Sequence, residues 1–317
     1  MRIFRHLDEV PADWASTIAS IGNFDGVHCG HQHVLARVVE RARRSLSKSI
    51  AVTFDPHPLR VLRPNTAPLL ITPLDQKLAN LDKAGIDAAL VITFDKQFST
   101  MSPRDFAKEI IGRKLHAKEV HEGTNFHFGH RAEGDCEKLK QFGKEFEFEV
   151  YLYHEMRLRG EPVSSSRIRQ LVSGGEVGKA RHLLGRPFSI ISTPAKGRGY
   201  GSRYTVPTIN LAPYSELVPR NGVYVTCTRV ARETFESVTN VGTRPTFARE
   251  SFAVETHLLN FHPLDLDEST EVEISFLKWL RPEIRWPNVE ALKEQIGKDV
   301  KKAKRFFALT RSNSSKV

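Results

Sequence analysis

Buried-strand and helical patterns alternate along the first 185 residues, and this alternation constrains the fold more than any other feature of the chain. Apolar segments suited to buried strands are followed by segments whose apolar residues repeat at helical spacing. Predicted strands cover residues 16–21, 49–54, 88–94, 118–121 and 146–153, and predicted helices include 74–84 and 103–115. Such alternation predicts an α/β fold with a parallel sheet, helices on both faces, and a ligand crevice at the carboxyl ends of the strands.

The pattern changes near residues 184–188, where helical periodicity gives way to short alternating segments. Val272, Ile274 and Phe276 alternate with polar residues, and residues 222–230 resemble a strand. This half predicts a small antiparallel β-barrel, closed by a helix from about 288 to 307, because closure removes exposed strand edges. We therefore expect two domains, residues 1–185 and 186–317, each long enough to bury a core.

Composition narrows the class of protein. No apolar run approaches the roughly 20 residues of a membrane span, and the N-terminus lacks the apolar core of a signal peptide, so we expect a cytoplasmic protein. The net charge of +10 is shared between both halves, and its one dense cluster, residues 298–305, is interpreted as the solvated face of a terminal helix. Small anionic substrates, rather than nucleic acid or membrane, are the expected partners; the oligomeric state stays open.

The segment Gly22–His31 places two histidines around a glycine where a predicted strand meets a predicted helix. Backbone N–H groups and the positive end of the helix dipole gather at such a point and stabilise a polyphosphate. His28 and His31 add donors for charge that develops on phosphorus. By itself, however, the tetrad of residues 28–31 also occurs in ordinary loops and in metal sites.

The whole ten-residue segment resembles the nucleotidyltransferase signature of bacterial bifunctional FAD synthetases, which join riboflavin kinase to FMN adenylyltransferase. Class I aminoacyl-tRNA synthetases have a related tetrad, but nothing in this chain resembles their lysine-rich second signature. The resemblance covers nearly the whole chain through at least five motifs in order. It implies a Rossmann-like nucleotidyltransferase domain followed by a β-barrel riboflavin kinase domain with a C-terminal helix.

The resemblance also implies site residues in the first domain. Those expected to bind nucleotide or phosphate are Gly22, Phe24, Asp25, Gly30, Asn125, Ser164, Ser165, Ser166 and Arg169. Those expected to bind the flavin are Phe54, Pro56, His57 and Pro58. Independently, arginines in the first turn of a helix oppose its dipole, and a bound anion would remove that conflict. Simpler interpretations are a Gly-rich surface loop around residue 125 and a rigid turn around residue 57.

In the second domain, the resemblance implies that Thr208 and Asn210 help to hold Mg²⁺ and the ATP phosphates, and that Glu255 removes a proton from riboflavin. Oxygen ligands suit a hard cation, and phosphoryl transfer depends mainly on positioning and charge neutralisation. A phosphate-binding role is likewise implied for three glycines, Gly197, Gly199 and Gly201. Alternatively, residues 208 and 210 are turn residues and Glu255 is a surface position on a strand.

The chain departs from the family pattern in the loop before Pro207. Ser192 and Thr205 stand where the family has glycine, and Ser202 stands where it has arginine. A β-branched residue in place of glycine narrows the backbone conformations available near a phosphate, so these changes leave the kinase activity in question.

We therefore expect an enzyme that phosphorylates riboflavin to FMN and adenylylates FMN to FAD. Its expected catalytic residues are His28, His31 and Glu255, its cofactor Mg²⁺, and its substrates ATP, riboflavin and FMN. Two alternatives remain: an adenylyltransferase with an impaired kinase module, and a flavin-binding regulator without catalytic activity.

Overall fold

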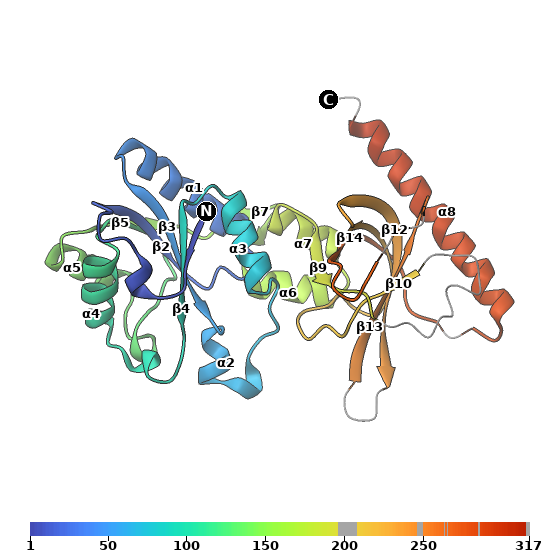
Figure 1. The fold of residues 1–317 in the computed structure, drawn as a ribbon, viewed down its shortest axis with the longest axis horizontal. Helices are drawn as coiled ribbons and strands as arrows, with labels where there is room; N and C mark the ends of the chain where they lie inside the picture. The colour runs from blue at the N-terminus through green and yellow to red at the C-terminus, as the bar shows by residue number, and fades with distance from the viewer. Residues whose placement is uncertain (196–207, 246–249, 263, 265, 285, 315–317) are drawn as a thin grey trace. The chain divides into compact units, whose positions relative to one another are not determined.

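The computed structural model describes the chain except for residues 196–207, 246–249, 263, 265, 285 and 315–317 (Figure 1). The backbone divides into two compact units, Met1–Ser165 and Ser166–Val317. Each unit contains one six-stranded sheet, parallel in the first and antiparallel in the second. This confirms the predicted order of domains, a parallel α/β fold followed by an antiparallel β module.

The sheet of the first unit has the strand order β1-β4-β3-β2-β5-β6, and all its neighbouring strands are parallel. Its strands are β1 (Arg2–Phe4), β2 (Thr17–Ile21), β3 (Lys48–Asp55), β4 (Ala88–Thr93), β5 (Ala117–Gly123) and β6 (Glu149–Tyr153). The chain places β3 and β4 on one side of β2, and β5 and β6 on the other. The order therefore reverses between β2 and β5, and ligands bind at the carboxyl ends of strands at such a point.

Helices cover both faces of this sheet, as predicted (Figure 1). The helical elements are α1 (Cys29–Arg44), α2 (Pro58–Leu62), α3 (Leu74–Lys83), α4 (Pro103–Asp105), α5 (Cys136–Glu145), η1 (Leu7–Glu9), η2 (Pro64–Thr66), η3 (Phe98–Thr100), η4 (Phe106–Lys114) and η5 (His130–Ala132). One core joins α1 and α3 to the sheet through Leu35, Val38 and Leu81. The other joins η4 and α5 to the opposite face through Ile110 and Leu139.

The first unit differs from the sequence prediction at three local positions. The predicted helix 103–115 is one helical turn, α4, that continues as the π-helical segment η4. The strand predicted from residue 146 begins at Glu149, because Phe146 and Phe148 donate their backbone N–H groups to the end of α5. Finally, β1 has only three residues and forms by pairing with β4, so its own sequence carries no strand signal.

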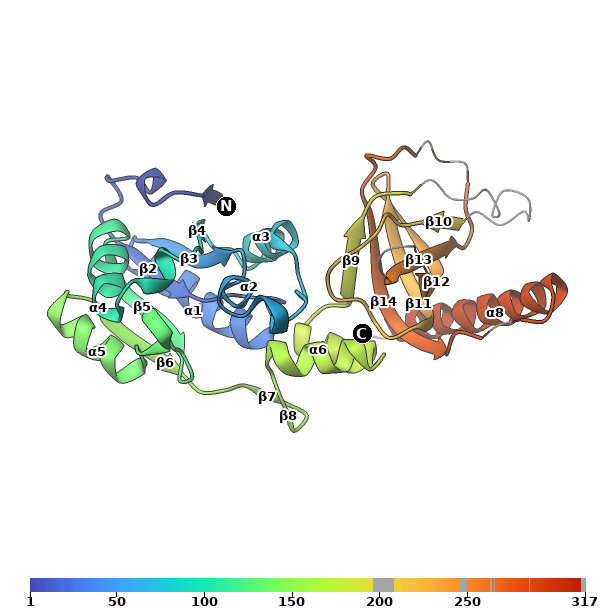
Figure 2. The same cartoon turned by 90° about the horizontal axis from the view of Figure 1, so that it is seen from below.

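The second unit is a curled antiparallel sheet with the order β10-β13-β12-β11-β14-β9 (Figure 2). Its strands are β9 (Phe188–Ser192), β10 (Thr208–Asn210), β11 (Gly222–Val230), β12 (Glu233–Pro245), β13 (Glu250–Leu258) and β14 (Val272–Arg281). The bounds of β11 match the prediction. The backbone after β9 also pairs with β10 through a bridge between Pro194 and Leu211, so the two edges of the sheet meet.

The helix α8 (Val289–Ser314) packs against this sheet and extends beyond the predicted end at residue 307. Ala303 and Phe307 bury apolar surface against β11 and β12. The guanidinium Nε of Arg281 lies 2.9 Å from the buried carboxylate of Asp299, and the Arg281 side chain is 14% exposed. Burial of the Asp299 carboxylate would be costly without this partner. The pair therefore links α8 to β14.

The division between the units precedes the predicted boundary at Gly185. The hairpin of β7 (Arg157–Leu158) and β8 (Glu161–Pro162) ends the first unit, and α6 (Ser165–Ser173) begins at the division. The next helix, α7 (Val177–Leu184), packs on β14 and β9. The division of the backbone therefore assigns α7, and all of α6 except Ser165, to the second unit. The residue at which an isolated second domain begins stays a prediction.

Candidate active sites

The loop Gly22–Val27 and the start of α1 lie at the carboxyl end of β2, beside the point where the strand order reverses. His28 caps α1: its Nδ1 accepts a hydrogen bond from the backbone N–H of His31 at 3.3 Å. Because Nδ1 accepts, a neutral His28 ring carries its proton on Nε2. A Cβ on Gly30 would lie 3.2 Å from that ring, so glycine allows the close approach.

The two predicted catalytic histidines form a stacked pair. Their ring centroids are 3.6 Å apart with an interplanar angle of 14°, and Phe24 supports His31 edge-on at 5.3 Å. Burial, with smaller contributions from His28 and Lys77, holds the pKa of His31 well below its ordinary 6.5. His31 is therefore neutral at physiological pH. Its buried Nδ1 has no hydrogen-bond partner among the described residues, which is unusual for a buried polar atom and fits a site for an incoming ligand.

Asp25 holds this loop in place. Its buried carboxylate accepts hydrogen bonds from the backbone N–H groups of Ile71 and Thr72 at 3.0 Å, and Ser165 donates its hydroxyl to the carbonyl of Asp25 at 2.8 Å. Phe24 and Val27 have φ values of 46° and 37°, a strained region for such residues. These contacts favour a positioning role for Asp25, and its role as a direct nucleotide ligand stays a prediction.

The predicted flavin segment follows β3. His57 is buried and caps α2, accepting at Nδ1 from the N–H of Leu59 at 3.2 Å, while Pro58 is the first residue of that helix. Phe54 packs edge-on against Phe94 at 5.8 Å and lies 6.1 Å from Phe98. Half-buried aromatic rings suit a flat heterocycle. The sequence prediction did not identify residues 94 and 98, since their proximity to residue 54 depends on the pairing of β3 with β4.

A second predicted nucleotide loop follows β5, directly beside β2. Asn125 is exposed, and a Cβ on Gly123 would meet its amide oxygen at 2.9 Å. Gly129 has a φ of 74°, and a Cβ there would lie 2.6 Å from Pro103. The motif glycines therefore have steric roles, in addition to any contact with nucleotide.

Glu122 connects the two loops and was missed by the sequence prediction. Its side chain is 5% exposed, and Oε1 accepts a hydrogen bond of 2.5 Å from the N–H of Ile21, the residue before the first loop. Burial raises the pKa of this carboxyl well above 4.5. A glutamate directly after the predicted strand 118–121 is a signal that could have identified it.

The remaining predicted phosphate ligands lie on or beside α6. Ser164 precedes the helix, Ser165 is its first residue, and Ser166 and Arg169 belong to the second unit. Of these, the structure connects Ser165 to the first loop, through Asp25. Roles for the other three residues stay predictions.

The predicted kinase residues lie on neighbouring strands of the second unit. Asn210 on β10 is directly opposite Glu255 on β13, and Thr208 is opposite His257. Asn240 on β12 is opposite Glu255 on the other flank. Directly paired residues point to the same face of a sheet, so Thr208, Asn210, Asn240 and Glu255 share one face. Gly197, Gly199 and Gly201 lie outside the described residues, as do Ser202 and Thr205.

This shared face fits a magnesium ion by the chemistry of its donors. A hydroxyl, two amide oxygens and a carboxylate are hard oxygen ligands of the kind Mg²⁺ binds beside substrate phosphates. In the part of the chain that the structure describes, this face included, no group of three or more His, Cys, Asp or Glu side chains has the arrangement of a metal site.

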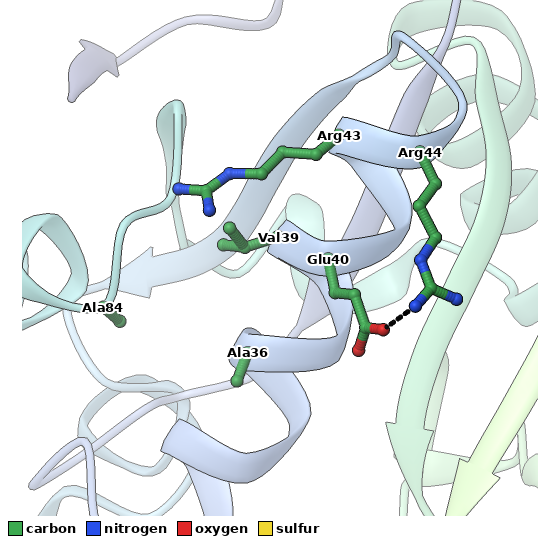
Figure 3. A pocket seen from close by; sticks show the side chains of 6 residues that line it. All are labelled: Ala36, Val39, Glu40, Arg43, Arg44 and Ala84. Carbon is green, nitrogen blue, oxygen red and sulfur yellow. Dashed lines mark ion pairs between the residues drawn. The ribbon is translucent and has the colours of Figure 1, made fainter.

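A separate surface pocket of about 470 Å³ lies toward the C-terminal end of α1 (Figure 3). Its lining residues are Ala36, Val39, Glu40, Arg43, Arg44 and Ala84. Arg44 and Glu40 pair there at 2.6 Å. None of the predicted site residues lines it, so this pocket is not the predicted nucleotide site.

Comparison with known proteins agrees with this architecture. Residues 10–167 match the family model for FAD synthetase, and residues 184–307 match that for riboflavin kinase. These matches define a two-module enzyme of flavin-cofactor synthesis. Two relatives are each named bifunctional riboflavin kinase/FMN adenylyltransferase. The one from Escherichia coli K12 is 31% identical over 312 residues and 98% of both chains; that from Pseudomonas fluorescens is 33% identical over 309 residues, 97% of this chain and 98% of its own. The chain belongs to the family of bifunctional riboflavin kinase/FMN adenylyltransferases.

A solved structure supports the fold. The crystal structure titled as a macrolide-efflux protein from Streptococcus pneumoniae matches 95% of this chain and 98% of its own, with a TM-score of 0.85 and 25% identity. In the chain itself, none of the helices formed by described residues has the length and apolar character needed to cross a membrane.

Proposed function

We propose that the first unit adenylylates FMN at the carboxyl ends of β2 and β5, and that the stacked pair of His28 and His31 performs this step. The FMN phosphate attacks the α-phosphorus of ATP and displaces pyrophosphate. Both rings lie at the N-terminus of α1, where backbone N–H groups favour anions. The neutral His31 ring and the Nε2–H of His28 would stabilise charge that develops on the transferred and leaving phosphates.

In the second unit, Glu255 would accept the proton of the riboflavin hydroxyl that attacks the γ-phosphorus of ATP. Thr208 and Asn210 would hold Mg²⁺ beside the phosphates, and the ion would supply charge neutralisation. Support comes from the register, which places Asn210 directly opposite Glu255. A carboxylate next to an amide on one sheet face places a base beside a phosphate-binding group.

The proposal includes a cytoplasmic location, where ATP is plentiful. None of the three cysteines, all of which the structure describes, is in a disulfide, which fits a reducing compartment.

Incubation of the full chain with riboflavin, ATP and Mg²⁺, followed by chromatography of the flavins, tests both assignments. The proposal predicts FMN as an intermediate and FAD as the final product. FAD formed from supplied FMN but not from riboflavin would indicate an impaired kinase module. Flavin binding with neither product would indicate a regulator.

A further inference from the structure

Lys77 is a buried cation that neither the sequence motifs nor the proposed mechanism includes. It lies on α3 with 4% of its surface exposed, at the spacing of i and i+4 from the core residue Leu81. Burying an ammonium group costs several kcal/mol unless an opposite charge or strong hydrogen bonds compensate. A lysine in this position therefore requires a compensating partner or a function.

The protein itself provides modest compensation. Lys77 Nζ donates to the hydroxyl of Thr53 at 3.2 Å and to the carbonyl of Phe54 at 3.5 Å, both neutral oxygens. Burial lowers the pKa of Lys77, while Asp25 and Asp55 oppose this effect from a longer distance. The ammonium therefore lies in a negative potential without a close ion pair among the described residues, an arrangement suited to an added anion.

The position of Nζ indicates which anion that is. Phe54 begins the segment assigned to the flavin, whereas Asp25 and His31 belong to the loop assigned to ATP. Thr53, the closest partner of Lys77, also donates its hydroxyl to the carbonyl of Asn23 in that loop, at 3.3 Å. The charge of Lys77 lowers the pKa of His31, so the two side chains share one electrostatic environment. The ammonium lies where the flavin and ATP segments adjoin.

We propose that Lys77 is a catalytic residue of the adenylyltransferase, and that its ammonium binds the phosphate monoester of FMN and directs it toward ATP. An FMN phosphate oxygen forms a bond to the α-phosphorus, the bond from that phosphorus to the bridging oxygen of the β-phosphate breaks, and pyrophosphate leaves with the electron pair. Lys77 keeps its proton throughout. Because His31 is neutral, Lys77 supplies the positive charge that holds two phosphate groups together.

The inference rests on the proposed adenylyltransferase site and is tested in the full chain with Lys77→Met, Lys77→Gln and Lys77→Arg. Lys83→Met is the matched control, since Lys83 is exposed at the end of the same helix. Met and Gln should lower FAD formation from supplied FMN by about 10²- to 10³-fold, the usual effect of removing one preorganised donor. Arg keeps the charge with a different geometry and should retain more activity. Riboflavin phosphorylation should match wild type in all four variants.

Two readouts separate catalysis from structure. Removing a buried charge should leave the melting temperature of Lys77→Met equal to or above wild type, and KM should rise more for FMN than for ATP. FAD formation by Lys77→Met and Lys77→Gln within threefold of wild type would overturn the proposal, as would a larger rise in KM for ATP. If the Lys77→Met variant does not fold, Lys77→Gln, which keeps a hydrogen-bond donor, is judged by the same FAD-formation rate and KM values. A wild-type chain that makes no FAD would instead refute the proposed function.

Discussion

Asn210 and Glu255 are directly opposed across the antiparallel pair of β10 and β13. This register brings together two residues that are 45 positions apart in the sequence, and it places Asn240 on the other side of Glu255. Two of the predicted kinase residues, Asn210 and Glu255, thus lie in one row with Asn240 across three strands.

Replacing Glu255 by Gln keeps its shape and removes its basicity. Loss of a general base lowers rates by about 10²- to 10⁴-fold, so FMN formation from riboflavin should fall by that factor. Steady-state assays of FMN production measure the effect. Glu271→Gln is the control because this glutamate is exposed, just before β14. FMN production at the wild-type rate in Glu255→Gln would reject the assigned base.

Asp25→Asn should destabilise the first unit and weaken adenylyl transfer together. The carboxylate accepts from two backbone N–H groups in the 71–72 segment, and hydrogen bonds to a charged group contribute about 1.5–3 kcal/mol. Urea unfolding should show a loss of that order, with a raised KM for ATP. Asp13→Asn, at an exposed position, should change neither. A variant with normal stability but no ATP binding would instead make Asp25 a direct ligand.

Glu122 predicts a pH dependence of stability with a defined sign. The folded carboxyl has a pKa well above 4.5 because it is buried. Above about pH 4.5 the unfolded chain therefore releases this proton while the folded chain keeps it, and the free energy of unfolding falls as pH rises toward the folded pKa. Glu122→Gln keeps an acceptor for the N–H of Ile21 and cannot ionise. Its stability relative to wild type should increase from pH 5 to pH 8.

Urea unfolding of both proteins at these two pH values measures that difference, and contributions from other titrating groups cancel in the comparison. An identical difference at pH 5 and pH 8 would contradict a raised pKa for Glu122.

Sequence patterns predict well those helices and strands whose formation depends on the periodicity of their own residues. The apolar repeat of Leu35, Val38 and Ala42 predicts α1, and alternation predicts β11, since each element has its own periodicity. Lys77, Phe94 and Glu122 escape prediction because their environments depend on which strands and helices pack together. Lys77 was detectable in principle as a charge on an apolar helix face. Its partner Thr53, by contrast, comes from another strand.

The boundary between the modules gives a further prediction. Val177, Ala180 and Leu183 of α7 are buried, and α7 packs on β14 and β9. A fragment of residues 186–317 should fold alone as a β-rich unit, yet melt at a lower temperature than a fragment of residues 166–317, because it lacks this packing. Circular dichroism melts compare the two. Equal melting temperatures would show that α6 and α7 do not stabilise the barrel.

The central claim is that two chemical steps are carried out by two separate sets of residues, and crossed substitutions test it most directly. His28→Ala and His31→Ala should each lower FAD formation from FMN by about 10²-fold or more, with riboflavin phosphorylation unchanged. Glu255→Gln should instead lower FMN formation from riboflavin and leave FAD formation from supplied FMN unchanged. Flavin chromatography measures each full-length variant in two separate reactions, one supplied with riboflavin and one with FMN. Loss of one step only in each variant supports the account, whereas FAD formation from FMN at the parent rate in His28→Ala, or loss of both steps in any folded variant, would contradict it.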